Sequence, residues 1–320
     1  MAKTTLPIVF ENINCMMCGC SESVPAGSTT WRDNMLAYSL CRGCGLKFMN
    51  PRPTRQWYLD FYASEFWEDK FQNKSWQEGT RLNWIWKLLK GGVSGRMRKG
   101  MKRAQLVVPE ILKHVQVNSA SRVLDVGCAF GLILHEIRKA TGAKVFGIEP
   151  NRSARAEAER RAAVEFIGNS AEDIISLSAF HGTFDLIIFS NVLENIVDPR
   201  PILEACKQLL SDKGVLYIDS PNVFYYDAMN PYHPFIYSPD TLTKLLESCG
   251  LSVRKILFEE STVAEAATNK PFSTPRPRFI TLFAVRGTAS PVQPCATAVQ
   301  TLLEEMALSA RRYKNVRRLR

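Results

Sequence analysis

Seven short runs rich in apolar and β-branched residues, most of them separated by stretches with helical periodicity, organise the second half of the chain. They cover residues 123–126, 144–149, 164–167, 184–189, 214–219, 251–258 and 279–285. Helical patterns separate the first six runs, whereas the sixth and seventh follow one another without a clear helix. This alternation is typical of a doubly wound α/β sheet. We therefore expect a Rossmann-like seven-stranded sheet that is mainly parallel, with its last strand antiparallel.

A different pattern occupies the segment before this region. Residues 57–86 hold ten aromatic residues, and the spacing of Tyr58, Phe61, Tyr62 and Phe66 predicts an amphipathic helix. Acidic residues interrupt the run, so packing on a neighbouring domain is favoured over a platform for stacking nucleobases. The glycines of residues 91–95 and the basic residues through Arg103 predict a mobile connector.

Composition narrows the class of protein. With 320 residues, 46% of them apolar and 22% charged, the chain is neither disordered nor fibrous, and its length suggests about two domains. No run approaches the length of a membrane span, and residues 6–10 are too short for a signal-peptide core. A soluble, cytoplasmic protein is expected.

The net charge of +10 is concentrated in the tail. Residues 311–320 hold six Lys/Arg and no acid, and without them the net charge is 35 − 31 = +4. Apolar positions at Leu302, Leu303, Met306 and Leu308 predict a terminal helix that leads into this basic end. Such a tail points only weakly to nucleic acid or a membrane surface.

Two pairs of cysteines have metal-ligand spacing. Cys15 and Cys18 form one C-x-x-C pair, Cys41 and Cys44 form another, and Cys20 is an additional member. The odd total of nine cysteines, without a secretion signal, argues for thiols or metal ligands rather than disulfides. Two such pairs predict a zinc ribbon, and four thiolates leave no open position, so a structural Zn²⁺ is expected rather than a catalytic one. Buried or redox-active thiols are the alternative.

These patterns divide the chain into four parts. Residues 1–50 are expected to form the zinc-ribbon segment and residues 51–115 the aromatic-rich helical segment with its basic connector. Residues 116–286 are expected to form the doubly wound domain, and residues 287–320 a helical basic tail.

A candidate ligand site follows the first strand of the predicted sheet. Residues 123–131 read V-L-D-V-G-C-A-F-G, which places Asp125 and a turn with Gly127 and Gly131 ahead of a helix. Bare backbone in the turn lets a ligand approach closely. Glu149 closes the second strand, where a carboxylate can accept both hydroxyls of a ribose. The nicotinamide fingerprint G-x-G-x-x-G is absent. The alternative is a tight connection that binds nothing.

The sequence resembles the class I S-adenosylmethionine-dependent methyltransferases over residues 122–251. The likeness rests on the glycine turn, on Glu149-Pro150, on residues 168–173 (G-N-S-A-E-D) and on residues 184–188 (F-D-L-I-I). Further matches are C-R-G-C-G-L running into N-P-R-P (residues 41–53), D-F-Y at residues 60–62, Pro221-Asn222 and residues 233–238. They resemble a bacterial branch with an N-terminal zinc-binding segment, whose members act mostly on sugars, surface-polysaccharide precursors and other small metabolites.

The resemblance implies roles for individual residues. Asp125, Gly127 and Gly131 would hold the methionine part of the cofactor, Glu149 the ribose, and Ser170 with Ala171 the adenine. It also implies that Tyr62, Ser190 and Asn191 border this site and that the seventh strand lies between the fifth and sixth. Ser170 stands where relatives usually have Asp, and Asn195 stands where relatives usually have a histidine after V-L-E. Cys128 is expected to pack or to contact the cofactor.

The proton acceptor is less well marked. His233, in the loop after the fifth strand, is the first candidate for a general base, and ordering of that loop is its alternative role. Glu194 is the second candidate, with helix capping or pocket lining as alternatives. Cys206, Cys249 and Cys295 read as incidental thiols, and His114, His135 and His181 as ordinary surface residues.

The sequence thus predicts methyl transfer to an oxygen or carbon of a small molecule, first among them a sugar, nucleotide sugar or surface-polysaccharide precursor. One alternative is an RNA methyltransferase that grips phosphate with its zinc ribbon and basic tail. Against it, Arg32 is the only basic residue between Cys18 and Cys41. Another alternative is a cofactor-binding partner protein without turnover, which the Asn195 departure keeps open.

Overall fold

The computed structural model describes residues 6–65, 95–224, 229, 231–258, 279–292, 294 and 299–307. Phe66 and the rest of the aromatic run, the acidic and basic residues of 259–278, Cys295, Leu308 and the basic end of the tail therefore lie outside the described residues. By internal packing the chain divides into two compact units. The first comprises Met1–Pro7 and Arg55–Ser170, and the second Ile8–Thr54 and Ala171–Arg320.

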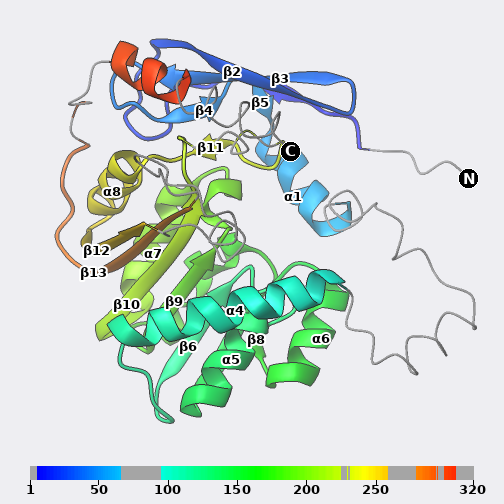
Figure 1. The fold of residues 1–320 in the computed structure, drawn as a ribbon. Coiled ribbons are helices and arrows are strands. Elements are labelled where there is room, and N and C mark those ends of the chain that lie inside the picture. The colour runs from blue at the N-terminus through cyan, green and yellow to red at the C-terminus, as the bar shows by residue number, and fades with distance from the viewer. Residues whose placement is uncertain are drawn as a thin grey trace, which may run out of the picture. The chain divides into compact units, whose positions relative to one another are not determined.

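Seven strands form the main sheet, in the order β12-β13-β10-β9-β6-β7-β8 (Figure 1). Their bounds are β6 Arg122–Val126, β7 Lys144–Ile148, β8 Glu165–Gly168, β9 Phe184–Ser190, β10 Leu210–Pro221, β12 Leu251–Phe258 and β13 Phe279–Arg286. Strand β13 pairs antiparallel with both β10 and β12, whereas β6, β7 and β8 pair in parallel, as do β9 and β10. The predicted seven-stranded sheet, with an antiparallel last strand between the fifth and sixth, is confirmed.

Helices α4, α5 and α6 accompany the parallel strands of the first unit (Figure 1). Helix α1 covers Arg55–Ser64, α4 Gly95–His114, α5 Leu132–Thr141 and α6 Arg152–Ala162. The predicted connector is therefore wrong from residue 95 onward, because Arg98, Lys99 and Lys102 lie on the exposed side of α4. The opposite side of this helix buries Ala104, Val107, Val108 and Ile111, which recur at intervals of three, one and three residues.

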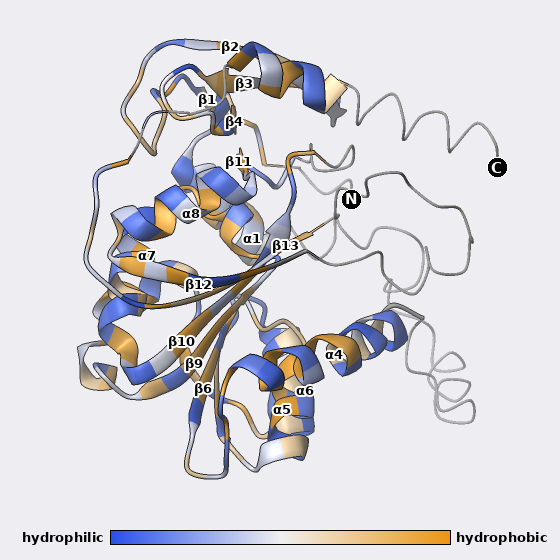
Figure 2. Cartoon of the chain, turned by 60° about the vertical axis from the view of Figure 1, so that its left-hand side comes forward, coloured by the Kyte–Doolittle hydropathy of each residue, from blue (hydrophilic) through white to orange (hydrophobic). Residues whose placement is uncertain are grey.

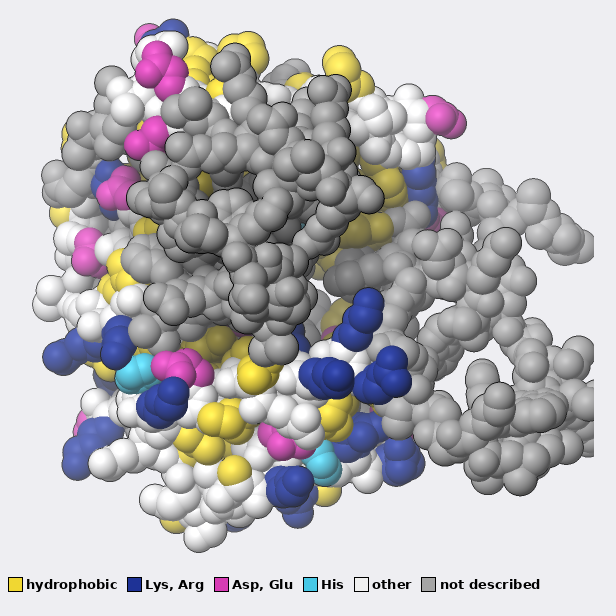
Figure 3. Space-filling model, in the orientation of Figure 1, with side chains coloured by type: hydrophobic (Ala, Val, Ile, Leu, Met, Phe, Trp, Pro, Cys, Tyr) yellow, Lys and Arg dark blue, Asp and Glu magenta, His cyan; other side chains and the backbone are white. Residues whose placement is uncertain are grey.

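Basic residues are concentrated on these three helices. The sequences of α4, α5 and α6 hold twelve Lys/Arg and four Glu, a net charge of 12 − 4 = +8. Figure 3 shows many of these side chains gathered over that part of the surface. The tail is therefore one of two basic regions, since removing both from the total of +10 leaves 10 − 8 − 6 = −4.

The second unit contains the ribbon. Strands β2 (Ser23–Trp31), β3 (Asn34–Cys41), β4 (Lys47–Met49) and β11 (Phe235–Ile236) form a four-stranded antiparallel sheet of order β11-β4-β3-β2. Strands β1 (Phe10–Glu11) and β5 (Arg52–Pro53) pair separately. Because β11 comes from the segment expected to belong to the doubly wound domain, the ribbon sheet is completed by residues almost 190 positions further along the chain.

One apolar cluster joins the ribbon to that distant segment. Leu36, Tyr38 and Met49 of the ribbon strands are buried together with Val223 and Ile236. Four partly buried residues pack against this cluster, namely Trp31, Phe224, Met229 and Met306. Met306 belongs to the helical residues 299–307, so the described part of the predicted terminal helix packs on the ribbon cluster.

The remaining elements of the second unit surround β9, β10, β12 and β13, whose central residues are mostly apolar (Figure 2). They are the 3-10 helices η1 (Ala171–Ser176), η2 (Ser178–Phe180) and η3 (Leu193–Asn195) and the helices α7 (Pro199–Leu209) and α8 (Pro239–Ser248). Only η1 and η2 connect β8 to β9, so the expected α-helix between the third and fourth strands is absent from these fully described residues. No described helix is long and apolar enough to cross a bilayer.

Candidate cofactor site, polar cluster and metal centre

The glycine turn of the first unit has an unusual backbone. Gly127, Ala129 and Gly131 have φ angles of 69°, 49° and 65°, so every second residue is left-handed. The amide nitrogens of Gly127 and Cys128 both donate to the carbonyl oxygen of Ile148, at 2.7 and 3.2 Å. Asp125, which precedes the turn on β6, is buried with 3% of its surface exposed. The turn is therefore held against the end of β7 with a buried carboxylate at its base.

Glu149 forms the other side of this turn. Its Oε2 accepts a hydrogen bond from the amide of Ala129 at 3.0 Å, and its Oε1 accepts one from the amide of Asn151 at 2.9 Å. The residue is 3% exposed. Each carboxylate oxygen can accept more than one hydrogen bond. Glu149 thus supports the turn and retains acceptor capacity for ribose hydroxyls.

Gly131 has a packing role of its own. A Cβ atom placed on it would lie 2.8 Å from Cβ and 3.2 Å from Cα of Ala158 on α6. The turn therefore needs glycine there both for its positive φ and for the close approach of α5 to α6. The geometry accounts for Gly131 whether or not a ligand contacts it.

Cys128 belongs to the packing of the turn. It is 6% exposed, and its Sγ lies 2.9 Å from the position that a Cβ on Gly147 would take. Burial raises the pKa of its thiol well above the ordinary value, and the charges of Asp125 and Glu149 raise it further. A thiol that stays protonated is a poor nucleophile, which agrees with the predicted packing role.

The other residues predicted to border the cofactor are spread over both units. Tyr62 lies on α1, with its ring centroid 6.3 Å from that of Tyr58. Ser170 follows β8 as the last residue of the first unit, and Ala171 begins η1 in the second. Both Ser170 and Ala171 are partly exposed. The structure therefore gives none of the three a contact that tests its predicted role.

A polar cluster lies at the ends of β9 and β10 in the second unit. The Ser190 hydroxyl and the Tyr217 hydroxyl donate to Oδ2 of Asp219, at 3.3 and 3.2 Å. The amide of Asn191, whose φ is 56°, donates to the carbonyl oxygen of Asp219 at 2.9 Å. Ser190 and Asn191 were predicted, whereas Asp219 was missed. The sequence feature that could have indicated Asp219 is its position as an acidic residue at the end of the fifth apolar run.

Glu194 is the most buried acid near this cluster. It is 1% exposed on η3, and its Oε2 accepts a hydrogen bond from the Ser220 hydroxyl at 3.1 Å. Burial of the Tyr237 phenol raises its pKa well above the ordinary value, and the charge of Glu194 raises it further. This burial fits pocket lining or proton handling better than a surface helix cap. Asn195 donates through Nδ2 to the carbonyl oxygen of Asn191 at 3.0 Å, so it closes the turn after β9.

His233 lies in the loop that leads to β11. Its carbonyl oxygen accepts a hydrogen bond from the Tyr38 hydroxyl at 3.0 Å, and the carbonyl oxygen of Pro234 accepts one from the Met49 amide at 2.9 Å. The residue is partly exposed. Its backbone therefore orders the loop on the ribbon, and its imidazole remains a candidate base.

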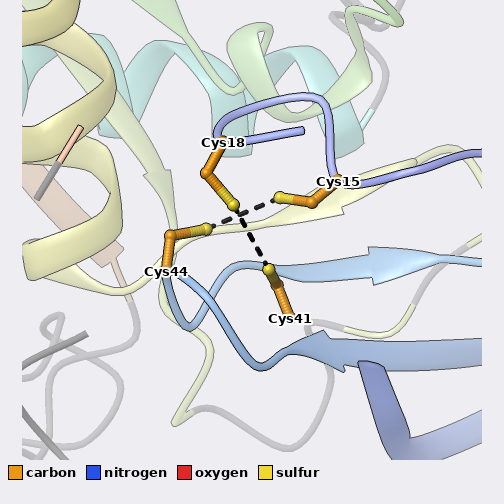
Figure 4. A group of neighbouring side chains, drawn as sticks. All are labelled: Cys15, Cys18, Cys41 and Cys44. Carbon is orange, nitrogen blue, oxygen red and sulfur yellow. Dashed lines mark hydrogen bonds between the residues drawn. The ribbon is translucent and has the colours of Figure 1, made fainter. Parts of the chain in front are cut away.

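Four cysteines converge between the ribbon turns (Figure 4). The ligand atoms of Cys15, Cys18, Cys41 and Cys44 all lie within 4.8 Å of one another. The Sγ atoms of Cys15 and Cys44 are 3.5 Å apart, as are those of Cys18 and Cys41. A tetrahedral Zn²⁺ with bonds of about 2.3 Å separates its sulfur ligands by about 3.8 Å. The four sulfurs therefore fit a zinc ion with little rearrangement.

The thiols also influence one another's protonation. Hydrogen bonds from Cys15 and Cys44 lower the pKa of Cys41, whereas the hydrogen bond with Cys41 raises the pKa of Cys15 to about 12. Cys20 lies beside this group, since its Sγ is 3.5 Å from the Cβ position of Gly43, but it is not a member of the four.

Comparison with known proteins identifies the family. The chain is 35% identical over 132 residues to the ubiquinone biosynthesis O-methyltransferase of Actinobacillus pleuropneumoniae serotype 5b, covering 38% of this chain and 56% of that protein. It is 29% identical over 163 residues to the human mitochondrial ubiquinone biosynthesis O-methyltransferase, covering 42% of each. The chain thus spans about half the length of the curated relatives it matches.

A solved structure of an S-adenosylmethionine-dependent methyltransferase from Mesorhizobium loti aligns at a TM-score of 0.45 with 18% identity, covering 56% of this chain and 96% of that one. The sequence also matches the family model described as a methyltransferase domain over residues 97–256. That match covers half of the chain and includes the glycine turn, Glu149 and the polar cluster, and on this ground the chain belongs to the methyltransferase domain family.

Proposed function

We propose that this protein is an S-adenosylmethionine-dependent methyltransferase whose first unit binds the cofactor. The observation that carries the proposal is the pair of buried carboxylates, Asp125 and Glu149, beside a turn of alternating left-handed residues. S-adenosylmethionine carries a sulfonium and an ammonium group, which buried acids favour, and a ribose whose hydroxyls suit Glu149. The residues present therefore fit this cofactor.

When bound, S-adenosylmethionine supplies an electrophilic methyl group, so the protein mainly has to position a nucleophile and exclude water. Such positioning is worth about 7 to 11 kcal/mol. Asp125 and Glu149 would orient the cofactor. Glu194 or His233 would accept the proton of an acceptor hydroxyl, a contribution of about 10² to 10⁴ in rate. Because Glu194 is buried and already accepts from Ser220, we place it in the proton-handling role together with His233.

We propose a small molecule as the methyl acceptor, with transfer to an oxygen or a carbon. The similarity to ubiquinone biosynthesis O-methyltransferases favours oxygen. Sugars, nucleotide sugars and surface-polysaccharide precursors form the first class to test, on the resemblance of the N-terminal segment. Intermediates of ubiquinone biosynthesis form the second class, because the relatives are ubiquinone biosynthesis O-methyltransferases. We further propose that the four cysteines bind a structural Zn²⁺.

Calorimetry of the zinc-loaded protein tests the cofactor. S-adenosylmethionine and its demethylated product should both bind the wild-type protein, and Glu149→Ala should bind them much more weakly. A folded, metallated wild-type protein that binds neither compound would refute the proposal. Binding without transfer to any acceptor in extracts of the source cell would instead favour a cofactor-binding partner protein without turnover.

A nucleic-acid substrate is the second candidate, and one observation favours it. The net charge of +8 on α4, α5 and α6 adds a basic surface to the tail. Phosphate contacts release counterions, so binding of an RNA oligonucleotide should weaken steeply with salt if this surface is used. A flat salt dependence would leave the small-molecule acceptor as the supported function.

A further inference from the structure

A buried lysine stands in the middle of the ribbon sheet. Lys47 on β4 is 4% exposed, and its Nζ lies 5.5 Å from the centroid of the Tyr38 ring. Among the described residues no carboxylate pairs with this ammonium and no acceptor receives a hydrogen bond from it. Burial lowers its pKa to about 8.

Packing alone does not explain a lysine at this position. Its register partners are Leu40 on β3 and Ile236 on β11, both buried. A buried charge that lacks an anionic partner destabilises the folded state, and one aromatic ring compensates only part of that cost. An apolar side chain of similar length would serve the sheet better, so the ammonium points to a ligand.

The surroundings of the ammonium connect it to the loop that carries His233. A Cβ atom on Gly27 would lie 3.9 Å from Nζ of Lys47 and 2.9 Å from Sδ of Met229, so the ammonium and the thioether converge on one point. The hydroxyl of Tyr38 donates to the carbonyl oxygen of His233. Met229 has a flexible, adaptable side chain, which can make way for a ligand group above Lys47.

We infer that Lys47 binds an anionic group of the methyl acceptor, so that the acceptor carries a carboxylate or a phosphate next to an apolar or flat body. That the bound anion belongs to a methyl acceptor rests on the proposed function, whereas the anion site itself does not depend on that function. The inference narrows the acceptor class to acids with one anionic group, such as sugar monophosphates or aromatic carboxylates, and excludes neutral sugars. A single ammonium among Tyr38 and Met229 suits one charged group rather than a polyphosphate.

Binding of simple anions tests the site. We would titrate the wild-type protein with benzoate, phenyl phosphate and the neutral benzamide and follow thermal unfolding. One or both acids should stabilise the protein, benzamide should not, and Lys47→Met should weaken the effective acid at least tenfold. Lys213→Met, which removes an exposed lysine of the same unit, should behave as the wild type. Benzoate and phenyl phosphate distinguish a carboxylate from a phosphate ligand.

The unliganded stability separates a binding role from a structural one. Lys47→Met should raise the unfolding midpoint by about 2 °C or more, because a methionine suits the buried position. A lower midpoint, an unchanged response to the acids in Lys47→Met, or no response of the wild type to either acid would overturn the inference. If Lys47→Met does not fold, Lys47→Gln provides the binding measurement, and an unchanged response to the acids in Lys47→Gln would overturn the inference.

The two proposals fail separately. Calorimetry with S-adenosylmethionine should give the same affinity in the wild type and in Lys47→Met. If the protein binds the cofactor and the acids bind equally well to the wild type and to Lys47→Met, only the present inference is refuted. Acid binding that depends on Lys47, without cofactor binding, refutes only the methyltransferase function.

Discussion

The hydroxyl of Tyr38 donates a hydrogen bond of 3.0 Å to the carbonyl oxygen of His233, 195 residues further along the chain. Together with the bond from the Met49 amide to the carbonyl oxygen of Pro234, it fixes the loop of the candidate base on the ribbon strands. The ribbon therefore has a second role beside its candidate metal centre. It is the surface on which this loop is built.

Removing that hydroxyl should loosen the loop. We expect Tyr38→Phe to lower the free energy of unfolding by about 1 kcal/mol and to reduce methyl transfer without changing S-adenosylmethionine affinity. Tyr237→Phe is the matched control, because the Tyr237 hydroxyl is buried without a hydrogen-bond partner among the described residues. Its removal should be neutral or stabilising. Equal losses in both variants, measured by chemical denaturation, would contradict this account of the loop.

Glu149 should control cofactor affinity. Glu149→Gln keeps the size of the side chain but removes the charge that accepts from the amides of Ala129 and Asn151, so we expect a 10- to 100-fold weaker affinity for S-adenosylmethionine. Glu165→Gln, an exposed change in the same unit, should leave the affinity unaltered. Calorimetric titration of both variants with S-adenosylmethionine measures the two affinities.

The metal should depend on four cysteines and not on the fifth. Cys44→Ser removes a fully buried ligand, and we expect the protein to lose its zinc and the ribbon sheet to unfold. Cys20→Ser should retain one zinc per chain with an unchanged unfolding midpoint. Atomic emission gives the metal content. A Cys20→Ser protein that lacks zinc would assign that residue to the metal centre.

Lys47 should make stability depend on pH. A lysine whose pKa is about 8 in the folded state and 10.5 in the unfolded state is protonated more readily when the chain unfolds. The destabilisation, roughly 3 kcal/mol, is complete below pH 8 and disappears as the pH rises to 10.5. The stability advantage of Lys47→Met over the wild type should therefore shrink across this range. An advantage that grows with pH would have the wrong sign.

Gly131 should tolerate no side chain. Gly131→Ala combines a positive φ with a clash against Ala158, and we expect a loss of about 2 to 4 kcal/mol. Gly182→Ala has a similar φ of 67° but meets no atom within 4 Å, so its loss should be about 1 kcal/mol. The difference between the two variants, measured by denaturation, isolates the contact of α5 with α6.

The sheet could be predicted because most of its strands contain a short, mainly apolar run bounded by turn signals. Helix α4 was missed at its start because the glycines near residue 95 and the dense charge beside them hide an apolar stripe that only becomes regular from Ala104. Strand β11 has two residues and pairs with β4, far away in the sequence. No local sequence pattern predicts a strand that is this short and pairs with such a distant segment.

The candidate site residues also fall into those that the sequence predicts and those that only the structure reveals. The glycine turn, Glu149 and the four cysteines are local patterns, so the sequence indicated them. Lys47 was missed because a lysine in a short strand reads as an exposed residue, and only the register of β3, β4 and β11 shows that it is buried. Asp219 likewise gains Ser190 and Asn191 as partners only because β10 pairs with β9.

The late arrival of β11 has a consequence for synthesis on the ribosome. The four cysteines of the candidate metal centre precede β11 in the chain, so they leave the ribosome before residues 235 and 236 do. Strand β4, however, has an open edge until residues 235 and 236 leave the exit tunnel. Nascent chains halted before that point should expose Phe48 and Lys47 to chaperones, and a shortened N-terminal fragment should aggregate rather than serve as an autonomous zinc module.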